Sequence, residues 1–252
     1  MDEQRSWIAA PATKMDIAPQ QVHVWRFALE QSDPITVRLR STLSSDELNR
    51  AEQFKFEKLQ RRFVIARGAL RDILCRYLHC APVQILFAYE KHGKPKLADE
   101  QNEQGLHFNL SHAENLALCA VTLQRMIGVD VEFVRPLADA ATIAQRFFAP
   151  SESSAFCALP EEKKTAAFFN CWTRKEAFIK AIGEGLSHPL HRFEVSFQEH
   201  EPAALLCTRP NPLEARTWKL YDLKPAADYA GALVVETDDL KLNYWQWEAP
   251  IE

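Results

Sequence analysis

The stretch from Phe168 to Gly185 constrains the fold most, because it is a strongly patterned helix with charged residues in unusual places. Four of its apolar side chains recur at helical spacing and mark a face packed on a core. These four are Phe168, Trp172, Ile179 and Ile182. Lys175 falls within this stripe, where a lysine requires a cleft or an anionic partner for its ammonium. Gly183 and Gly185 predict the end of the helix, where the backbone takes positive φ.

Glu176 and Lys180 lie one turn apart on the flank of this stripe, close enough to act on one bound group. Taken by itself, the stretch also fits an ordinary amphipathic helix with a surface ion pair and a lysine that extends to solvent. The choice between these interpretations depends on the rest of the chain.

A second informative segment, residues 127–134, alternates as a strand does. Val129 and Val131 share one face, so Asp130 and Glu132 point together from the other. Two carboxylates held this close repel each other unless a cation lies between them, and oxygen ligands suit a hard metal such as Mg²⁺. The alternative is a half-exposed strand with an acidic face turned to solvent.

The composition of the 252 residues, 47% hydrophobic and 25% charged, is that of a soluble globular protein. No apolar run reaches the roughly 20 residues that span a bilayer, and the first five residues do not resemble a signal peptide. The sequence therefore predicts a cytoplasmic protein without membrane contact. The net charge of −4 argues against nucleic-acid binding, so an anionic ligand must meet a local positive cluster. Six cysteines without a CxxC pair predict buried free thiols.

The first part of the chain predicts an irregular arm over residues 1–20, a strand over 21–27 and a turn at 31–34. Ser44 and Glu47 have the spacing of a capping box and open a helical region that runs, with one break, to about residue 78. This region contains the densest positive run of the protein, which is either a solvated face or a phosphate-facing patch. The run consists of Arg50, Lys55, Lys58, Arg61, Arg62, Arg67 and Arg71.

Two short motifs lie between these helices and the acidic strand. Gly93-Lys94-Pro95 predicts a turn that combines close backbone approach with a positive charge, although such loops are common. Residues 106–112 alternate as a strand that ends in Ser111 and His112, which supply hydroxyl and imidazole donors at a sheet edge. A Ser-His pair is more often a turn cap, and no G-x-S-x-G motif surrounds Ser111 to suggest acyl transfer.

The remaining segments repeat the same rough order of strands and helices. We predict helices over residues 137–148 and from 150 onward, and five strand segments between residues 191 and 247. The fold class is therefore α+β, with two similar halves that meet near residues 123–126. The predicted domains are residues 1–124 and 125–252.

Taken together, these motifs resemble those of the 4′-phosphopantetheinyl transferase superfamily, in its long, monomeric Sfp type. Residues 128–132 (GVDVE) and 172–180 (WTRKEAFIK) resemble its two signatures, about forty residues apart and in the same order. Residues 93–95 and 108–112 resemble its upstream motifs. The resemblance covers residues 45–240. It implies two α+β halves that enclose coenzyme A in the cleft between them, with Mg²⁺ on its pyrophosphate.

The resemblance also implies an activity and a role for each matched residue. The enzyme would move phosphopantetheine from coenzyme A to a serine of an apo acyl or peptidyl carrier protein and release 3′,5′-ADP. Asp130, Glu132 and Glu176 would bind Mg²⁺ or Mn²⁺, and the catalytic residues would be Glu176, Lys180 and Asp130. Residues matched to coenzyme A binding are Arg50, Arg62, Gly93, Lys94, Pro95, Ser111, His112, Asp130, Lys175 and Lys180.

Two other functions remain open from the sequence. A metal-dependent nucleotide diphosphate hydrolase would use the same carboxylates with water as the nucleophile. A catalytically inactive module that binds the carrier or coenzyme A is the non-enzymatic alternative, although the full set of charged residues argues against it.

Overall fold

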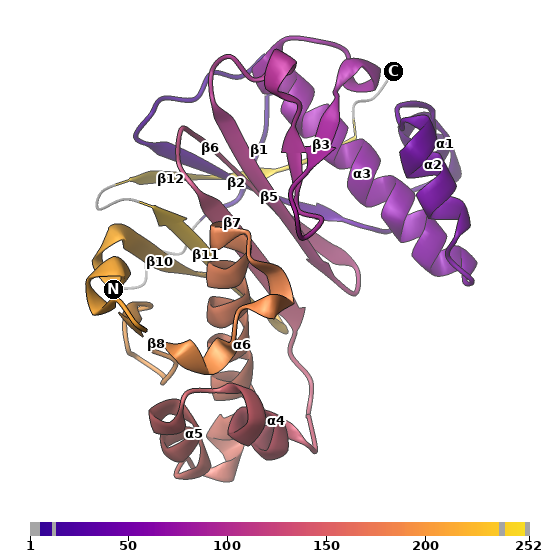
Figure 1. The fold of residues 1–252 in the computed structure, drawn as a ribbon. Helices are drawn as coiled ribbons and strands as arrows, with labels where there is room; N and C mark the ends of the chain where they lie inside the picture. The colour runs from indigo at the N-terminus through magenta and orange to yellow at the C-terminus, as the bar shows by residue number, and fades with distance from the viewer. Residues whose placement is uncertain (1–5, 12–13, 237–239, 250–252) are drawn as a thin grey trace.

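The first half of the molecule is built on a five-stranded sheet with strand order β1-β12-β2-β6-β5. The computed structural model describes residues 6–11, 14–236 and 240–249. The strands are β1 (Ile8–Ala9), β2 (Gln21–Ala28), β5 (Leu106–Ala113), β6 (Leu116–Leu123) and β12 (Lys241–Gln246). β12 runs parallel to β1 and β2, whereas β2, β6 and β5 pair antiparallel. The last strand in sequence therefore lies inside the sheet of the first half (Figure 1).

Helices cover one face of this sheet. They are α1 (Asp33–Ser41), α2 (Ser45–Glu52) and the 22-residue α3 (Glu57–Leu78). Ile65, Leu70 and Leu74 of α3 pack into a core with Trp25 and Phe27 of the sheet. A small hairpin of β3 (Phe87–Tyr89) and β4 (Pro95–Leu97) follows α3 in the chain.

The second half has a three-stranded antiparallel sheet with strand order β10-β11-β7. Its strands are β7 (Ile127–Phe133), β10 (Trp218–Leu223) and β11 (Tyr229–Glu236). A second 22-residue helix, α6 (Glu161–Ile182), packs on this sheet, and α4 (Ala140–Phe147) and α5 (Pro150–Cys157) pack near the start of α6 (Figure 1). A two-stranded ribbon, β8 (Phe193–Val195) with β9 (Leu205–Thr208), completes this half.

A third apolar cluster lies where the two sheets meet. Val22 and Val24 of β2 pack there with Val129 and Val131 of β7. Each half therefore has one main sheet and one long helix, and the two main sheets share a core between them. This arrangement confirms the predicted α+β fold of two similar halves. Within the described ranges, no helix has the length and apolar character needed to cross a membrane.

The structure corrects two of the predictions for individual segments. The expected turn at residues 31–34 is the start of α1, because Pro34 occupies the first turn of a helix, where its missing N–H costs nothing. The arm over residues 1–20 contains the two-residue β1, and residues 1–5 and 12–13 lie outside the described residues. All six cysteines are free as predicted, but only Cys119 and Cys171 are buried, and Cys157 is exposed.

Gly128 lets β7 lie directly against α6. A Cβ atom at this position would lie 2.0 Å from the carbonyl oxygen of Ala177 and 2.4 Å from the amide nitrogen of Ala181. Both atoms belong to the helix backbone and have no room to move aside. The missing side chain therefore fixes how closely the acidic strand approaches the helix that carries Glu176 and Lys180.

We expect Gly128→Ala to lower the free energy of unfolding by about 1–3 kcal/mol, the usual cost of overpacking a filled core. Urea denaturation of the purified variant measures this loss. Gly231→Ala on β11 is the matched control, because its added methyl would meet its nearest atoms at 3.2 Å and is expected to cost less. Equal stability of the wild type and Gly128→Ala would show that β7 and α6 separate freely.

Candidate active site

A cavity of about 300 Å³ lies between the two halves, at β5, β7 and α6. Its lining comprises Ser111, His112, Asp130, Val131, Glu132, Trp172, Glu176 and Lys180. The structure therefore brings together residues that are far apart in sequence and that three separate motifs supplied. The alternation of β7 places the valines in the core between the sheets and the two carboxylates on the cavity side, as predicted.

Asp130, Ser111 and Lys180 form a closed polar triangle at the edge of this cavity. The Lys180 ammonium lies 2.6 Å from Oδ1 of Asp130 and donates to the Ser111 hydroxyl at 2.8 Å. The Ser111 hydroxyl in turn donates to the same Oδ1 at 2.9 Å. Asp130 is buried, with 4% of its surface exposed. Its charge is therefore held by a lysine from the facing helix and a hydroxyl from the neighbouring strand.

Two carboxylate oxygens beside this triangle have no partner. In the part of the chain that the structure describes, Oδ2 of Asp130 and Oε1 of Glu176 are buried without a hydrogen bond. Buried polar atoms are rarely left without a hydrogen-bond partner. Two acceptor oxygens on facing elements cannot hydrogen-bond to each other, but both can bind one cation. The donor chemistry of this site is therefore compatible with Mg²⁺.

The three carboxylates predicted to bind metal affect one another's pKa values, but they are not grouped closely enough to form a metal site. Burial, together with repulsion from Asp130, raises the pKa of Glu132 to about 7. Burial and the same neighbour also raise the pKa of Glu176. Among the residues described, however, no three His, Cys, Asp or Glu side chains are grouped closely enough to hold a metal ion. The assignment of these three residues as ligands remains a prediction.

Asn109 is a residue of this site that sequence reasoning missed. Its side-chain oxygen accepts a hydrogen bond from the backbone N–H of Val129 at 2.8 Å. Asn109 is buried on β5, so this bond ties the edge strand of the first sheet to β7 of the second, next to Asp130. The alternation of residues 106–112 indicated its face but gave no sign of this contact. Trp172 was predicted on the core stripe, and it also lines the cavity while stacking on Phe168.

A second cavity of about 240 Å³ adjoins the first and shares Lys180 with it. Gly93, Lys94 and Pro95 line this cavity, and their contact with coenzyme A stays a prediction. The Lys94 ammonium, however, donates to two backbone carbonyls, those of Lys180 at 2.6 Å and Ile127 at 3.1 Å. Lys94 therefore holds the backbone of α6 and β7 in this structure.

Lys175 is placed differently from its prediction. It is fully buried in the second half, where its ammonium lies 2.7 Å from Oε2 of Glu152. It also donates to the carbonyls of Leu190 and Phe193 at 2.9 and 2.7 Å. All three N–H groups are thus satisfied outside the cavity. The structure contradicts the predicted contact of Lys175 with coenzyme A phosphates, although the need for an anionic partner was predicted correctly.

The positive run of α2 and α3 does not form one patch. Arg50 lies over the ring of Phe63 and is not among the described residues that line either cavity. Arg62 pairs with Glu114 at 3.3 Å on the turn after β5. It is also close enough to His112 to help lower the pKa of that imidazole, although burial is the larger cause. Of the two arginines predicted to bind the donor, Arg62 is therefore the one near the cavity.

Comparison with known proteins agrees with this geometry. Residues 31–124 match the family described as "4'-phosphopantetheinyl transferase, N-terminal", and residues 126–234 match the 4'-phosphopantetheinyl transferase superfamily. The chain is 41% identical over 244 residues to 4'-phosphopantetheinyl transferase HetI of Nostoc sp., covering 97% of this chain and 99% of HetI. The chain belongs to the 4′-phosphopantetheinyl transferase superfamily. The predicted family and enzyme class are therefore confirmed.

Two Bacillus transferases are also similar to this member of the superfamily. The psf-1 protein of Bacillus pumilus is 34% identical over 194 residues, which cover 77% of this chain and 79% of psf-1. Sfp of Bacillus subtilis is 29% identical over 188 residues, which cover 75% of this chain and 80% of Sfp. The matches to both family models and to Sfp identify the two-domain form of the family.

Proposed function

We propose that this phosphopantetheinyl transferase moves the phosphopantetheine arm of coenzyme A to a serine hydroxyl of an apo acyl or peptidyl carrier protein. The observation that carries this proposal is the pair of buried, unpartnered oxygens of Asp130 and Glu176 beside the Lys180 ammonium, among the residues described. Phosphoryl transfer requires neutralisation of a pyrophosphate and a correctly placed nucleophile, and these residues supply groups for both tasks.

The residues of this site suit a magnesium ion, with manganese as an alternative that accepts the same ligands. Asp130 and Glu176 would hold it through their unpartnered oxygens, and Glu132 would be the third ligand. When bound, the ion would neutralise pyrophosphate charge and stabilise the leaving group.

The chain's own side chains would perform the remaining tasks. Glu176 would accept the proton of the carrier serine, whose oxygen then forms a bond to the phosphorus next to pantetheine. The bond from that phosphorus to the bridging oxygen breaks, and 3′,5′-ADP leaves with the electron pair. A raised pKa makes Glu176 a better proton acceptor than a solvated carboxylate. Lys180 would place its ammonium against the pyrophosphate, and Ser111 would keep Asp130 in position.

The second cavity would hold the nucleotide end of coenzyme A, between Gly93, Pro95 and the end of α6. His112 and Arg62 would meet its phosphates from the β5 side. We further propose that the enzyme is cytoplasmic, and that it is a monomer because one chain supplies both walls of the cavity. The proposed domain boundary lies near residue 124, but residues 241–246 of the predicted second domain return to the sheet of the first half as β12.

The test is an incubation of the purified protein with coenzyme A labelled in its pantetheine moiety, Mg²⁺ and a panel of apo carrier proteins. Label on a carrier serine, found by mass spectrometry together with free 3′,5′-ADP, is the expected result. Release of 3′,5′-ADP without any carrier would instead support a hydrolase that uses water. Binding of coenzyme A with neither product would support the inactive module.

A further inference from the structure

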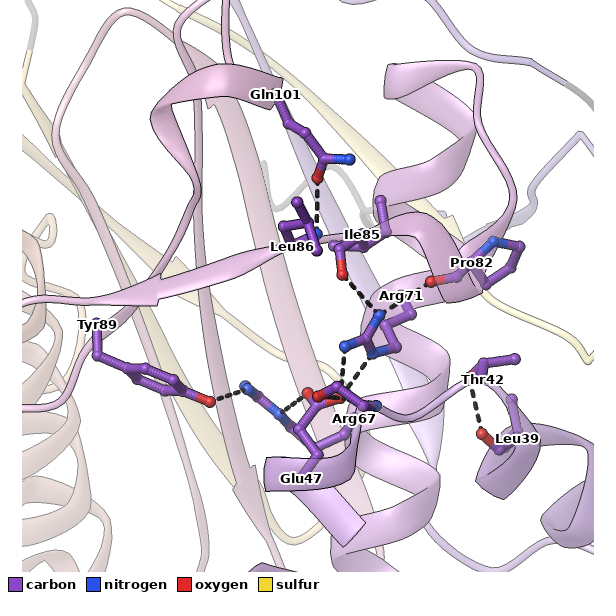
Figure 2. A network of polar contacts seen from close by, with 11 residues as sticks. Leu39, Thr42, Glu47, Arg67, Arg71, Pro82, Ile85, Leu86, Tyr89 and Gln101 are labelled. Carbon is purple, nitrogen blue, oxygen red and sulfur yellow. Dashed lines mark hydrogen bonds and ion pairs between the residues drawn. The ribbon is translucent and has the colours of Figure 1, made fainter.

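The hairpin that lines the second cavity is attached at its base to a buried charge cluster on α2 and α3. Glu47 and Arg71 are each 1% exposed and Arg67 is 7% exposed. The Glu47 carboxylate accepts hydrogen bonds from Nε of Arg67 at 2.8 Å and Nε of Arg71 at 2.7 Å (Figure 2). Two guanidinium groups thus share one carboxylate, and their remaining donors must find partners elsewhere.

Those partners lie in the segment that leads into the hairpin and at Tyr89, the last residue of β3, which pairs with Pro95 of β4. Arg71 donates to the carbonyls of Pro82 and Ile85 at 3.1 and 2.8 Å, and Nη2 of Arg67 donates to the Tyr89 hydroxyl at 2.9 Å (Figure 2). Both guanidinium groups also lie over the ring of Phe87, 4.7 and 5.1 Å from its centre. The base of the hairpin is therefore held to the first half of the molecule.

The tip of the hairpin rests on the second half. Lys94 donates to the carbonyls of Lys180 and Ile127, as described above. Gly183, at the end of α6, has no side chain, and this makes room for Glu90 of the turn. A Cβ atom at Gly183 would lie 2.7 Å from the Glu90 carboxylate. Residues 87–97, which we call the strap, therefore run from the charge cluster of one half to the end of α6 in the other.

From these contacts we propose that the strap positions the donor site, with two positioning residues: Tyr89, which pairs with Pro95 beside the turn, and Lys94 in the turn itself. Lys94 holds the backbone of Lys180, whose ammonium enters the first cavity. The Arg67–Tyr89 bond holds the wall formed by residues 93–95 at a fixed distance from α6. The buried charge cluster thus acts on the donor without touching it. This inference rests on the proposed function, because it assigns the second cavity to coenzyme A.

Tyr89→Phe tests the link between the strap and the charge cluster, because it removes the hydroxyl that Arg67 contacts and leaves the ring in place. We expect the KM for coenzyme A and its dissociation constant, measured by calorimetry, to rise about fivefold. The reason is that a binding wall that is no longer held in place must be ordered when coenzyme A binds, which lowers the affinity. The kcat, the KM for the carrier and the melting temperature should stay close to wild type. Hydrogen exchange should accelerate at the amides of residues 87–97. Tyr229→Phe on β11 is the control: its hydroxyl accepts from the backbone N–H of Asn115 at 3.4 Å, outside the strap, and its removal should leave the coenzyme A dissociation constant and the exchange of residues 87–97 unchanged.

Lys94→Met tests the tip, since it keeps the apolar stem and removes the ammonium. We expect it to lower kcat/KM for coenzyme A about tenfold. The double variant with Tyr89→Phe should lose less than the product of the single effects, because the second loss acts on a strap that is already free. Unchanged coenzyme A affinity and unchanged exchange in Tyr89→Phe, or strictly multiplicative losses in the double variant, would overturn the proposal. If the wild type transfers no label to any carrier and binds no coenzyme A, the proposed function itself fails.

Discussion

Glu176→Gln is expected to lower kcat for phosphopantetheine transfer by about 10³-fold, within the range that a positioned general base contributes. The substitution keeps the size and polarity of the side chain and removes its ability to accept a proton. It also replaces one proposed metal-binding oxygen of a carboxylate by a neutral amide. Formation of holo-carrier under saturating coenzyme A, followed by mass spectrometry, measures the effect.

Glu184→Gln is the matched control for this experiment. Glu184 lies just beyond the end of the same helix, is 59% exposed and pairs with His188 at 2.7 Å. Glu184 is not among the described residues that line either cavity, so the kcat of the Glu184→Gln variant should equal that of the wild type. A folded Glu176→Gln protein with normal kcat would remove Glu176 from the reaction.

Lys175→Met is expected to lower the free energy of unfolding by about 3–5 kcal/mol, the usual cost of removing one partner of a buried ion pair. Glu152 is 4% exposed, and burial already raises its pKa, while Lys175 is the main influence that lowers it. Without the lysine, Glu152 must remain charged and unpaired or take up a proton. Guanidinium denaturation measures the loss.

Two further variants separate the buried pair from ordinary surface effects. Glu152→Gln combined with Lys175→Met should recover part of the stability, because no buried charge is left unpaired. Lys163→Met removes an exposed lysine of the same helix, 51% exposed and 3.1 Å from Glu199, and should change stability by less than about 1 kcal/mol. Normal stability of Lys175→Met with lost coenzyme A binding would restore the phosphate contact that the sequence suggested.

Most of the candidate site was predictable from local patterns. The two-residue period of β7 correctly separated Val129 and Val131 from Asp130 and Glu132, because side-chain direction in a strand depends only on position along it. The one-turn spacing of Glu176 and Lys180 likewise placed both on the cavity side of α6. The helix ends at Gly183 with φ of 72°, as its glycine indicated.

The contacts that the sequence did not reveal depend on tertiary structure. Spacing showed that Lys175 needs an anionic partner, but Glu152 belongs to another helix and its proximity depends on how α5 packs. For the same reason, the arginines of α3 looked like one positive face, although Arg67 and Arg71 turn inward to Glu47. The helix α1 was missed because a proline after a serine and an aspartate is equally typical of a turn.

The position of β12 has a consequence for how the protein forms during synthesis. β12 pairs with β1 on one side and β2 on the other, although among the described strands it is the last to be synthesised. The first sheet therefore stays incomplete, with β2 exposed along one edge, until residue 246 has emerged. A nascent chain stalled after β11 would have the carboxylates proposed for catalysis and both long helices, but the sheet of its first half would lack β12 between β1 and β2.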